Sequence, residues 1–131
     1  MIVFDTNAVL RYILQDMVDI ADYVESQMQR EKYMIPVEVL AEIVYVLEKV
    51  YKIDRQRIAH ELVLTVNEPN ALIPHKQVVE KALQVYDQTK LDFVDCLLIG
   101  YAKIEGHRII SYDKKLNNYL TANGAVSGTQ T

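Results

Sequence analysis

Short apolar runs alternate with segments of helical spacing, and this alternation limits the possible fold more than any other feature of the chain. The runs expected to form buried strands are 2–4, 33–35, 71–73 and 108–111. The segments expected to form helices are 6–14, 18–30, 37–50, 54–66, 76–89 and 92–106, with a last short helix from Asp113. Strands that alternate with helices favour parallel pairing through helical crossovers. The sequence therefore predicts an α/β fold class with a short central parallel sheet flanked by helices.

Helical spacing also separates apolar from polar stripes on individual helices. From residue 37 onward the apolar stripe consists of Val39, Leu40, Ile43, Val44, Leu47 and Val50. Glu42 lies on the other stripe with Glu38, so spacing alone favours a solvated glutamate. Over 18–30 the expected apolar face is Ile20, Ala21, Val24 and Met28.

Three aspartates stand alone against apolar segments. Asp5 follows the first apolar run, Asp95 is the only charge within 93–102, and Asp113 follows the last apolar run. A carboxylate in such a place is costly unless it is hydrogen-bonded, paired or bound to a cation. Because ligands of open parallel sheets bind beyond the carboxyl ends of the strands, we expect the three carboxylates to share one acidic pocket.

Such a pocket suits a hard divalent cation. Carboxylates that lie close together repel one another, and Mg²⁺ or Mn²⁺ with its preference for oxygen ligands removes that cost. A divalent ion also polarises a phosphoryl oxygen and activates water, which makes phosphate chemistry the leading hypothesis. The neighbouring polar residues Thr6, Asn7 and Ser111 are candidates to orient the carboxylates.

Each acid also has an alternative role as a helix cap. Asp5 and Asp113 each precede an expected helix, and either Asp92 or Asp95 fits the start of the helix over 92–106. By position Asp92 is the better cap and Asp95 the less readily explained acid. The residues alone leave both roles open.

Composition bounds the remaining possibilities. A chain of 131 residues with 50% hydrophobic residues predicts a single domain, which we place over 1–120, followed by a frayed polar tail over 121–131. The single cysteine, Cys96, suits a reducing cytoplasm, and no segment resembles a signal peptide or membrane span. The net charge of −4 argues against a general nucleic-acid coat protein. No Gly-rich phosphate loop and no serine or cysteine nucleophile motif is present.

Four segments in order resemble the motifs of PIN-domain ribonucleases, and the size is that of the VapC-like toxins of toxin–antitoxin pairs. The segments are 2–10, 39–47, 91–99 and 109–116. The resemblance implies a PIN-like three-layer sandwich and a metal-dependent endoribonuclease that uses Mg²⁺ or Mn²⁺. The acids it assigns to catalysis and metal binding are Asp5, Glu42, Asp95 and Asp113, with Asp5 and Asp95 as the main ligands. The residues it places in support of them are Thr6, Asn7, Ser111 and Asp92.

The resemblance also implies partners. The first is an RNA substrate, which would be cut to leave a 5′-phosphate and a 3′-hydroxyl. The second is another copy of the chain in a homodimer. The third is a small antitoxin whose tail fills the active-site groove. Basic residues near the motifs are candidate phosphate contacts, although ordinary solvated charge explains them equally well: Arg11, Lys90, Lys114 and Lys115. One departure is the region 123–126, which is a poor match to the final strand of the family.

Other functions remain as alternatives. A phosphohydrolase with Asp5 as nucleophile would need a second aspartate two residues later, where this chain has Asn7. A non-catalytic PIN-like RNA-binding or scaffold module is a further alternative, although all four acidic positions are filled. Activity on DNA is not excluded by an acidic site alone.

Overall fold

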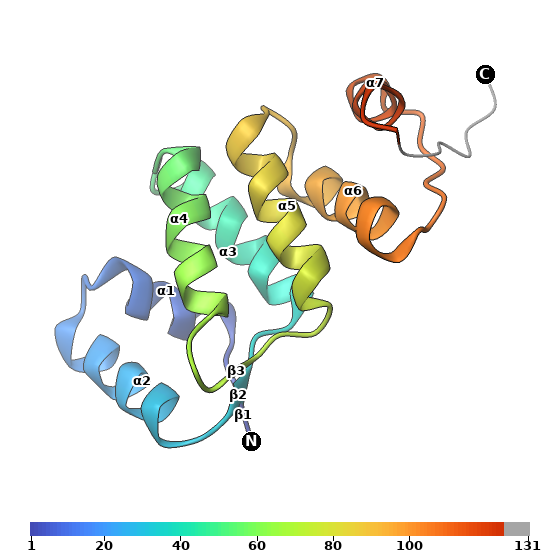
Figure 1. Ribbon diagram of the computed structural model, residues 1–131. Coiled ribbons are helices and arrows are strands. Elements are labelled where there is room, and N and C mark those ends of the chain that lie inside the picture. Colours follow the sequence, from blue (N-terminus) through green and yellow to red (C-terminus); the bar gives the residue numbers. More distant parts are fainter. Residues whose placement is uncertain (125–131) are drawn as a thin grey trace. The chain divides into compact units, whose positions relative to one another are not determined.

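Three two-residue strands form a parallel sheet in the order β1-β2-β3. They are β1 (Ile2–Val3), β2 (Tyr33–Met34) and β3 (Ala71–Leu72), and Tyr33 is in register with both Ile2 and Ala71. The structure is a computed structural model and describes residues 1–124. The expected α/β fold class with a short parallel sheet between helices is confirmed (Figure 1).

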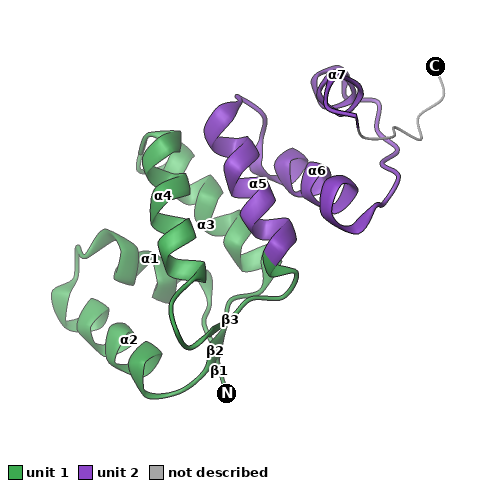
Figure 2. Ribbon diagram, viewed as in Figure 1, with its two compact units in different colours: residues 1–76 green, residues 77–131 purple. Residues whose placement is uncertain are grey.

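Contacts divide the chain into two compact units, residues 1–76 and 77–131 (Figure 2). In the first unit, two helices separate each strand from the next. They are α1 (Thr6–Leu14), α2 (Val18–Arg30), α3 (Val37–Lys49) and α4 (Arg55–Val66). The helix α5 (Lys76–Gln88) begins at the boundary, and α6 (Phe93–Glu105) and α7 (Lys114–Ala122) follow it. A single domain over 1–120 stays a prediction.

The apolar stripes account for most of the core of the first unit. On α3, Leu40, Ile43, Val44 and Leu47 are buried as expected, whereas Glu42 on the opposite stripe is exposed. Two of the predicted core residues are wrong. Val50 lies just past the end of α3 and is 65% exposed, and Ile20 lies in the first turn of α2, at the edge of its buried stripe, and is 41% exposed.

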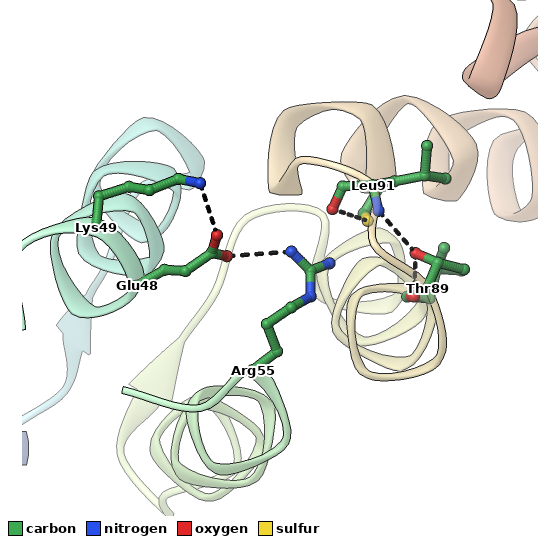
Figure 3. Close-up of polar contacts among 7 residues, drawn as sticks. Glu48, Lys49, Arg55, Thr89 and Leu91 are labelled. Carbon is green, nitrogen blue, oxygen red and sulfur yellow. Dashed lines mark hydrogen bonds and ion pairs between the residues drawn. The ribbon is translucent and has the colours of Figure 1, made fainter. Parts of the chain in front are cut away.

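An ion-paired cluster joins the end of α3 to the start of α4 (Figure 3). The carboxylate of Glu48 lies 3.1 Å from Nη1 of Arg55 and 3.0 Å from Nζ of Lys49.

In the second unit, Thr89 terminates α5: its hydroxyl donates to the carbonyl of Val85 and accepts from the backbone N–H of Leu91. Helix α5 therefore ends at Gln88, one residue earlier than predicted.

The strand predicted over 108–111 is wrong. Ile109 forms only a single-residue bridge, and it is buried while Ile110 is 63% exposed. The backbone after Ile110 forms hydrogen bonds with the side chains of Ser111 and Asn117. The carbonyl of Ser111 accepts from the amide of Asn117 at 2.6 Å, and the hydroxyl of Ser111 accepts from the backbone N–H of Asp113 at 3.0 Å. These local hydrogen bonds compete with a strand ladder.

The last helix continues beyond the expected start of the tail. Helix α7 ends at Ala122, two residues into the segment predicted to fray, and its Leu120 is buried. Of the region 123–126 considered for a final strand, residues 125 and 126 lie outside the described residues, as does the rest of the tail. Within residues 1–124, no helix has the length and apolar character needed to cross a membrane.

A close approach between α5 and α6 yields the first prediction. A Cβ atom added at Gly100 would lie 2.6 Å from the carbonyl oxygen of Val78 and 3.0 Å from its Cγ1. Glycine to alanine in a helix normally adds up to about 1 kcal/mol of stability. Because the clash involves backbone, we expect Gly100→Ala to lower the free energy of unfolding by about 1–3 kcal/mol instead.

Urea unfolding of both proteins measures this change. The exposed α6 residue Val94 supplies the control, since Val94→Ala removes no buried packing and should leave stability within about 0.5 kcal/mol. A stabilised Gly100→Ala protein would show that the two helices do not meet in this way.

Candidate active site

Asp5 lies directly beyond the carboxyl end of β1 and is the N-cap of α1. Its Oδ1 accepts a hydrogen bond from the backbone N–H of Ala8 at 2.9 Å, and its backbone is extended. Such a cap satisfies one of the N–H groups that a helix leaves unpaired at its start. The capping role considered for Asp5 is therefore real. The capping hydrogen bond occupies Oδ1 of Asp5, and the structure gives Oδ2 no hydrogen bond within residues 1–124.

Asp113 repeats this arrangement in the second unit. It is the N-cap of α7, and its Oδ1 accepts from the backbone N–H of Leu116 at 2.8 Å. The Ser111 hydroxyl holds the backbone N–H of Asp113, so Ser111 fixes the turn that carries this acid. Asn117 anchors the same turn from α7. We had no expectation for Asn117 from the sequence, although its position four residues after Asp113 places both on one face of α7.

Glu42 lies in the middle of α3 with its side chain exposed. The helix fixes its position through the buried neighbours Leu40, Ile43 and Val44. The structure gives its carboxylate no hydrogen bond and no ion pair among the residues it describes. An acid that is firmly positioned by its helix and has no partner is available to a ligand.

Asp95 is surrounded by apolar residues of its own helix and by negative charge. It lies in the first turn of α6, half-buried, while Asp92 is exposed at the N-cap position and makes no side-chain capping bond. Burial, followed by the negative charges of Asp113 and Asp92, raises the pKa of Asp95. The negative charges of Asp113 and Asp92 therefore disfavour the ionised form of Asp95, and a bound cation would relieve such repulsion.

The structure places the four predicted acids in both units. Asp5 and Glu42 belong to residues 1–76, and Asp95 and Asp113 belong to residues 77–131. Each unit by itself supplies carboxylate oxygens, the donors that Mg²⁺ and Mn²⁺ prefer. Within the described part of the chain, no three His, Cys, Asp or Glu side chains form a group able to hold a metal ion. A site shared by all four acids stays a prediction.

The supporting residues at the first motif are less engaged than expected. Thr6 is half-buried and Asn7 is exposed, and among residues 1–124 neither side chain hydrogen-bonds to Asp5. The backbone N–H of Ala8 orients that carboxylate instead. Support from Thr6 and Asn7 stays a prediction.

The candidate RNA contacts differ in their freedom to bind a phosphate. Arg11 is 12% exposed at its side chain, pairs with Asp16 at 2.7 Å and donates to the Tyr51 hydroxyl at 3.1 Å. The two partners engage Nη1 and Nη2, and Nε is buried without a hydrogen bond among the described residues, so the guanidinium is less accessible to a phosphate than an exposed lysine. Lys90, Lys114 and Lys115 are exposed, and within the described residues they form no ion pair.

The two capping aspartates permit a variant series that separates folding from chemistry. Asparagine caps a helix about as well as aspartate, whereas alanine does not. We expect Asp5→Ala to lower the free energy of unfolding by about 1 kcal/mol and Asp5→Asn to leave it nearly unchanged. Urea denaturation followed by circular dichroism measures both.

Asp54 is the matched control for this series, because it occupies the N-cap position of α4 without a capping hydrogen bond. Asp54→Ala should therefore cost less than Asp5→Ala. Equal losses in the two alanine variants would contradict the assigned cap.

Comparison with known proteins identifies the family of the chain. The family model of the PIN domain matches residues 2–119. Over 92 residues the chain is 29% identical to a VapC ribonuclease of Aquifex aeolicus (strain VF5), an alignment that covers 70% of this chain and 68% of that protein. No solved structure gives a significant match. Since the family model spans almost all of the described residues, the chain belongs to the PIN-domain family.

Proposed function

We propose that this protein is a divalent-metal-dependent endoribonuclease that hydrolyses RNA phosphodiester bonds, and that it is the toxin of a toxin–antitoxin pair. The similarity to a VapC ribonuclease and membership of the PIN-domain family support this function. The observation that carries the proposal is the acidic environment of Asp95. Asp95 is half-buried, and the negative charges of Asp113 and Asp92 raise the pKa of its carboxyl, a repulsion that a bound cation would relieve.

Four carboxylates would hold the metal. Asp5 and Asp95 would be its main ligands, and Glu42 and Asp113 would complete the shell directly or through water. When bound, Mg²⁺ or Mn²⁺ would supply a Lewis acid that stabilises the charge developing on the phosphate and activates the attacking water. Asp92 would add negative charge beside Asp95 and support the site.

The backbone keeps two of these acids in place without using their whole carboxylates. Oδ1 of Asp5 is held by the Ala8 N–H, and Oδ1 of Asp113 is held by the Leu116 N–H. Each retains a second oxygen for a ligand. Ser111 and Asn117 fix the turn before α7, so the acid at its end keeps one orientation.

The exposed lysines would position the RNA. Lys90, Lys114 and Lys115 carry their charges free of ion pairs within the described residues and lie close in sequence to Asp95 and Asp113. Cations of this kind contact phosphates without reading the base sequence. Target choice would then rest with the shape of the RNA and with its bases.

The central test is an RNA cleavage assay. We expect the full-length protein to cut total cellular RNA at discrete sites with Mg²⁺ or Mn²⁺, and to lose this activity in EDTA. Asp95→Asn should lower the rate on the order of 100-fold or more, because it removes charge from the ion-binding cluster while preserving side-chain shape. Sequencing of the product ends measures the cleavage sites.

Asp87→Asn is the matched control, since it removes one exposed carboxylate in α5 that has no role in the proposed site. It should cleave RNA like the wild-type protein. Full activity in Asp95→Asn would contradict the assigned site. Binding of RNA without any cleavage under every metal condition would favour the scaffold alternative.

The proposed partners generate a separate prediction. We propose a cytoplasmic homodimer whose groove is filled by the tail of a small antitoxin. Light scattering should then give twice the chain mass of 15.1 kDa. A reading frame beside this gene that encodes a small DNA-binding protein should yield a protein that co-purifies with the chain and inhibits RNA cleavage. A monomer whose activity this companion leaves unchanged would contradict the toxin–antitoxin assignment.

A further inference from the structure

Helices α1 and α3 carry the two candidate metal ligands of the first unit. Asp5 caps α1, and Glu42 lies in the middle of α3. The strands that precede the two helices pair in parallel, and just before the helices begin the backbone N–H of Phe4 donates to the carbonyl of Met34 at 3.2 Å. The helices also pack on each other. The sheet therefore fixes the first turns of α1 and α3 relative to one another.

The side chain of Arg11 connects the other ends of the same two helices. Arg11 lies in the last turn of α1, and its Nη2 donates to the hydroxyl of Tyr51, two residues past the end of α3, at 3.1 Å. Its Nη1 lies 2.7 Å from Oδ2 of Asp16, which follows the C-cap of α1. Asp16 belongs to the end of α1 itself, so the bond to Tyr51 is the contact that crosses to α3.

The backbone holds Tyr51 against the end of α3. The N–H of Tyr51 donates to the carbonyl of Val46 at 3.1 Å, and the N–H of Ile53 donates to the carbonyl of Leu47 at 3.0 Å. Both acceptors lie within α3. The hydroxyl that Arg11 contacts therefore belongs to a residue whose backbone is fixed to that helix.

The guanidinium of Arg11 is also enclosed. The side chain is 12% exposed, and Nε is buried without a hydrogen bond among the described residues. Burying a cationic group is costly unless it is paired and hydrogen-bonded, and here the pairing uses Nη1 and Nη2. This arrangement is suited to connecting parts of the protein and less suited to holding an exposed phosphate.

We propose that Arg11 is a positioning residue, which connects α1 to α3 and thereby sets the separation of Asp5 and Glu42. This inference rests on the proposed function, in which the two acids bind one metal ion. With the sheet at one end and the bond from Arg11 to Tyr51 at the other, both ends of the helix pair are held. Ligands of a metal site must be held close to the productive geometry, so loosening one end would weaken ion binding.

Tyr51→Phe is the sharpest variant, because it removes only the hydroxyl that accepts the bond from Arg11. The Tyr51 side chain is 42% exposed, so the fold should be kept. Tyr45→Phe is the matched control: Tyr45 is an exposed tyrosine of α3 whose hydroxyl has no hydrogen bond among residues 1–124. Arg11→Met removes the connection from the other side.

The first measurement is the distance between spin labels at Asn7→Cys and Glu38→Cys, read by electron paramagnetic resonance on the full-length protein. Asn7 lies two residues after Asp5, Glu38 lies one helical turn before Glu42, and both are exposed, whereas Cys96 is buried. We expect the distance distribution to widen in Tyr51→Phe and in Arg11→Met, and to stay unchanged in Tyr45→Phe. This readout depends on neither metal nor RNA.

The second measurement compares Mn²⁺ binding by calorimetry with the kinetics of RNA cleavage. Tyr51→Phe should lower the Mn²⁺ affinity and kcat about ten-fold and leave KM for RNA unchanged. Arg11→Lys should do the same, because lysine keeps the charge but lacks the planar fork that reaches two partners. A direct phosphate contact would instead raise KM in Arg11→Met, recover in Arg11→Lys and be unaffected by Tyr51→Phe.

Coupling between the two residues decides the outcome. The double variant Arg11→Met with Tyr51→Phe should lose no more affinity than Arg11→Met alone, since both remove one contact. The proposal is overturned if the losses add, or if the label distances in Tyr51→Phe match those in Tyr45→Phe. If the wild-type protein binds no Mn²⁺ and cuts no RNA, the proposed function is wrong, and the label distances alone decide whether Arg11 sets the separation.

Discussion

The pairing of Tyr33 with a strand on each side is the interaction on which the first unit depends. All three strands are two residues long, and only β2 bonds to both of the others. A sheet this short has few ladder hydrogen bonds, so its register is fixed by burial of Tyr33 and by the edge-to-face contact of that ring with Phe4 at 5.3 Å. The register in turn fixes where β1 ends, and hence where Asp5 and α1 begin. The position of one candidate metal ligand therefore depends on a buried aromatic residue in the neighbouring strand.

The second unit also has a short segment followed by an aspartate that caps a helix, but this segment is not a strand. There Ser111 and Asn117 hold the turn, and Asp113 caps α7. The hydrogen bonds of the Ser111 and Asn117 side chains position the backbone before Asp113, as the pairing of β1 with β2 positions the backbone before Asp5. Two unrelated local structures thus present an aspartate with one oxygen engaged and the other available. This shared outcome explains why capping and metal binding, which appear as alternatives in the sequence, are compatible in the structure.

The sequence predicted the elements well, because helical spacing and capping residues are local signals. The bounds of α1 and α2 are as expected, and Asp92 rather than Asp95 takes the N-cap position of α6. Errors arose where hydrogen bonds of particular side chains decide the backbone or the partners of a residue. Ile109 lies in an apolar run that resembles a strand, but the hydrogen bonds of Ser111 and Asn117 hold the backbone that follows it. The engagement of Arg11 by Asp16 and Tyr51, the latter 40 residues away in sequence, had no local signal. The positions of Asp5 and Asp113 at segment ends and their capping roles were predictable, whereas the partners of Arg11 were not.

The single-oxygen caps of Asp5 and Asp113 have a consequence for how the site would respond to changing metal supply. A carboxylate that already holds its helix needs little rearrangement to accept an ion, so most of the binding free energy remains available for the ion itself. Both caps are formed by protein atoms alone, so the two helices would not depend on the proposed ion for their stability. With the proposed metal site, the protein would stay folded when the ion dissociates, unlike small domains that unfold without their metal. The activity of the protein would depend on the free concentration of the ion in the cell. The amount of folded protein would not depend on it.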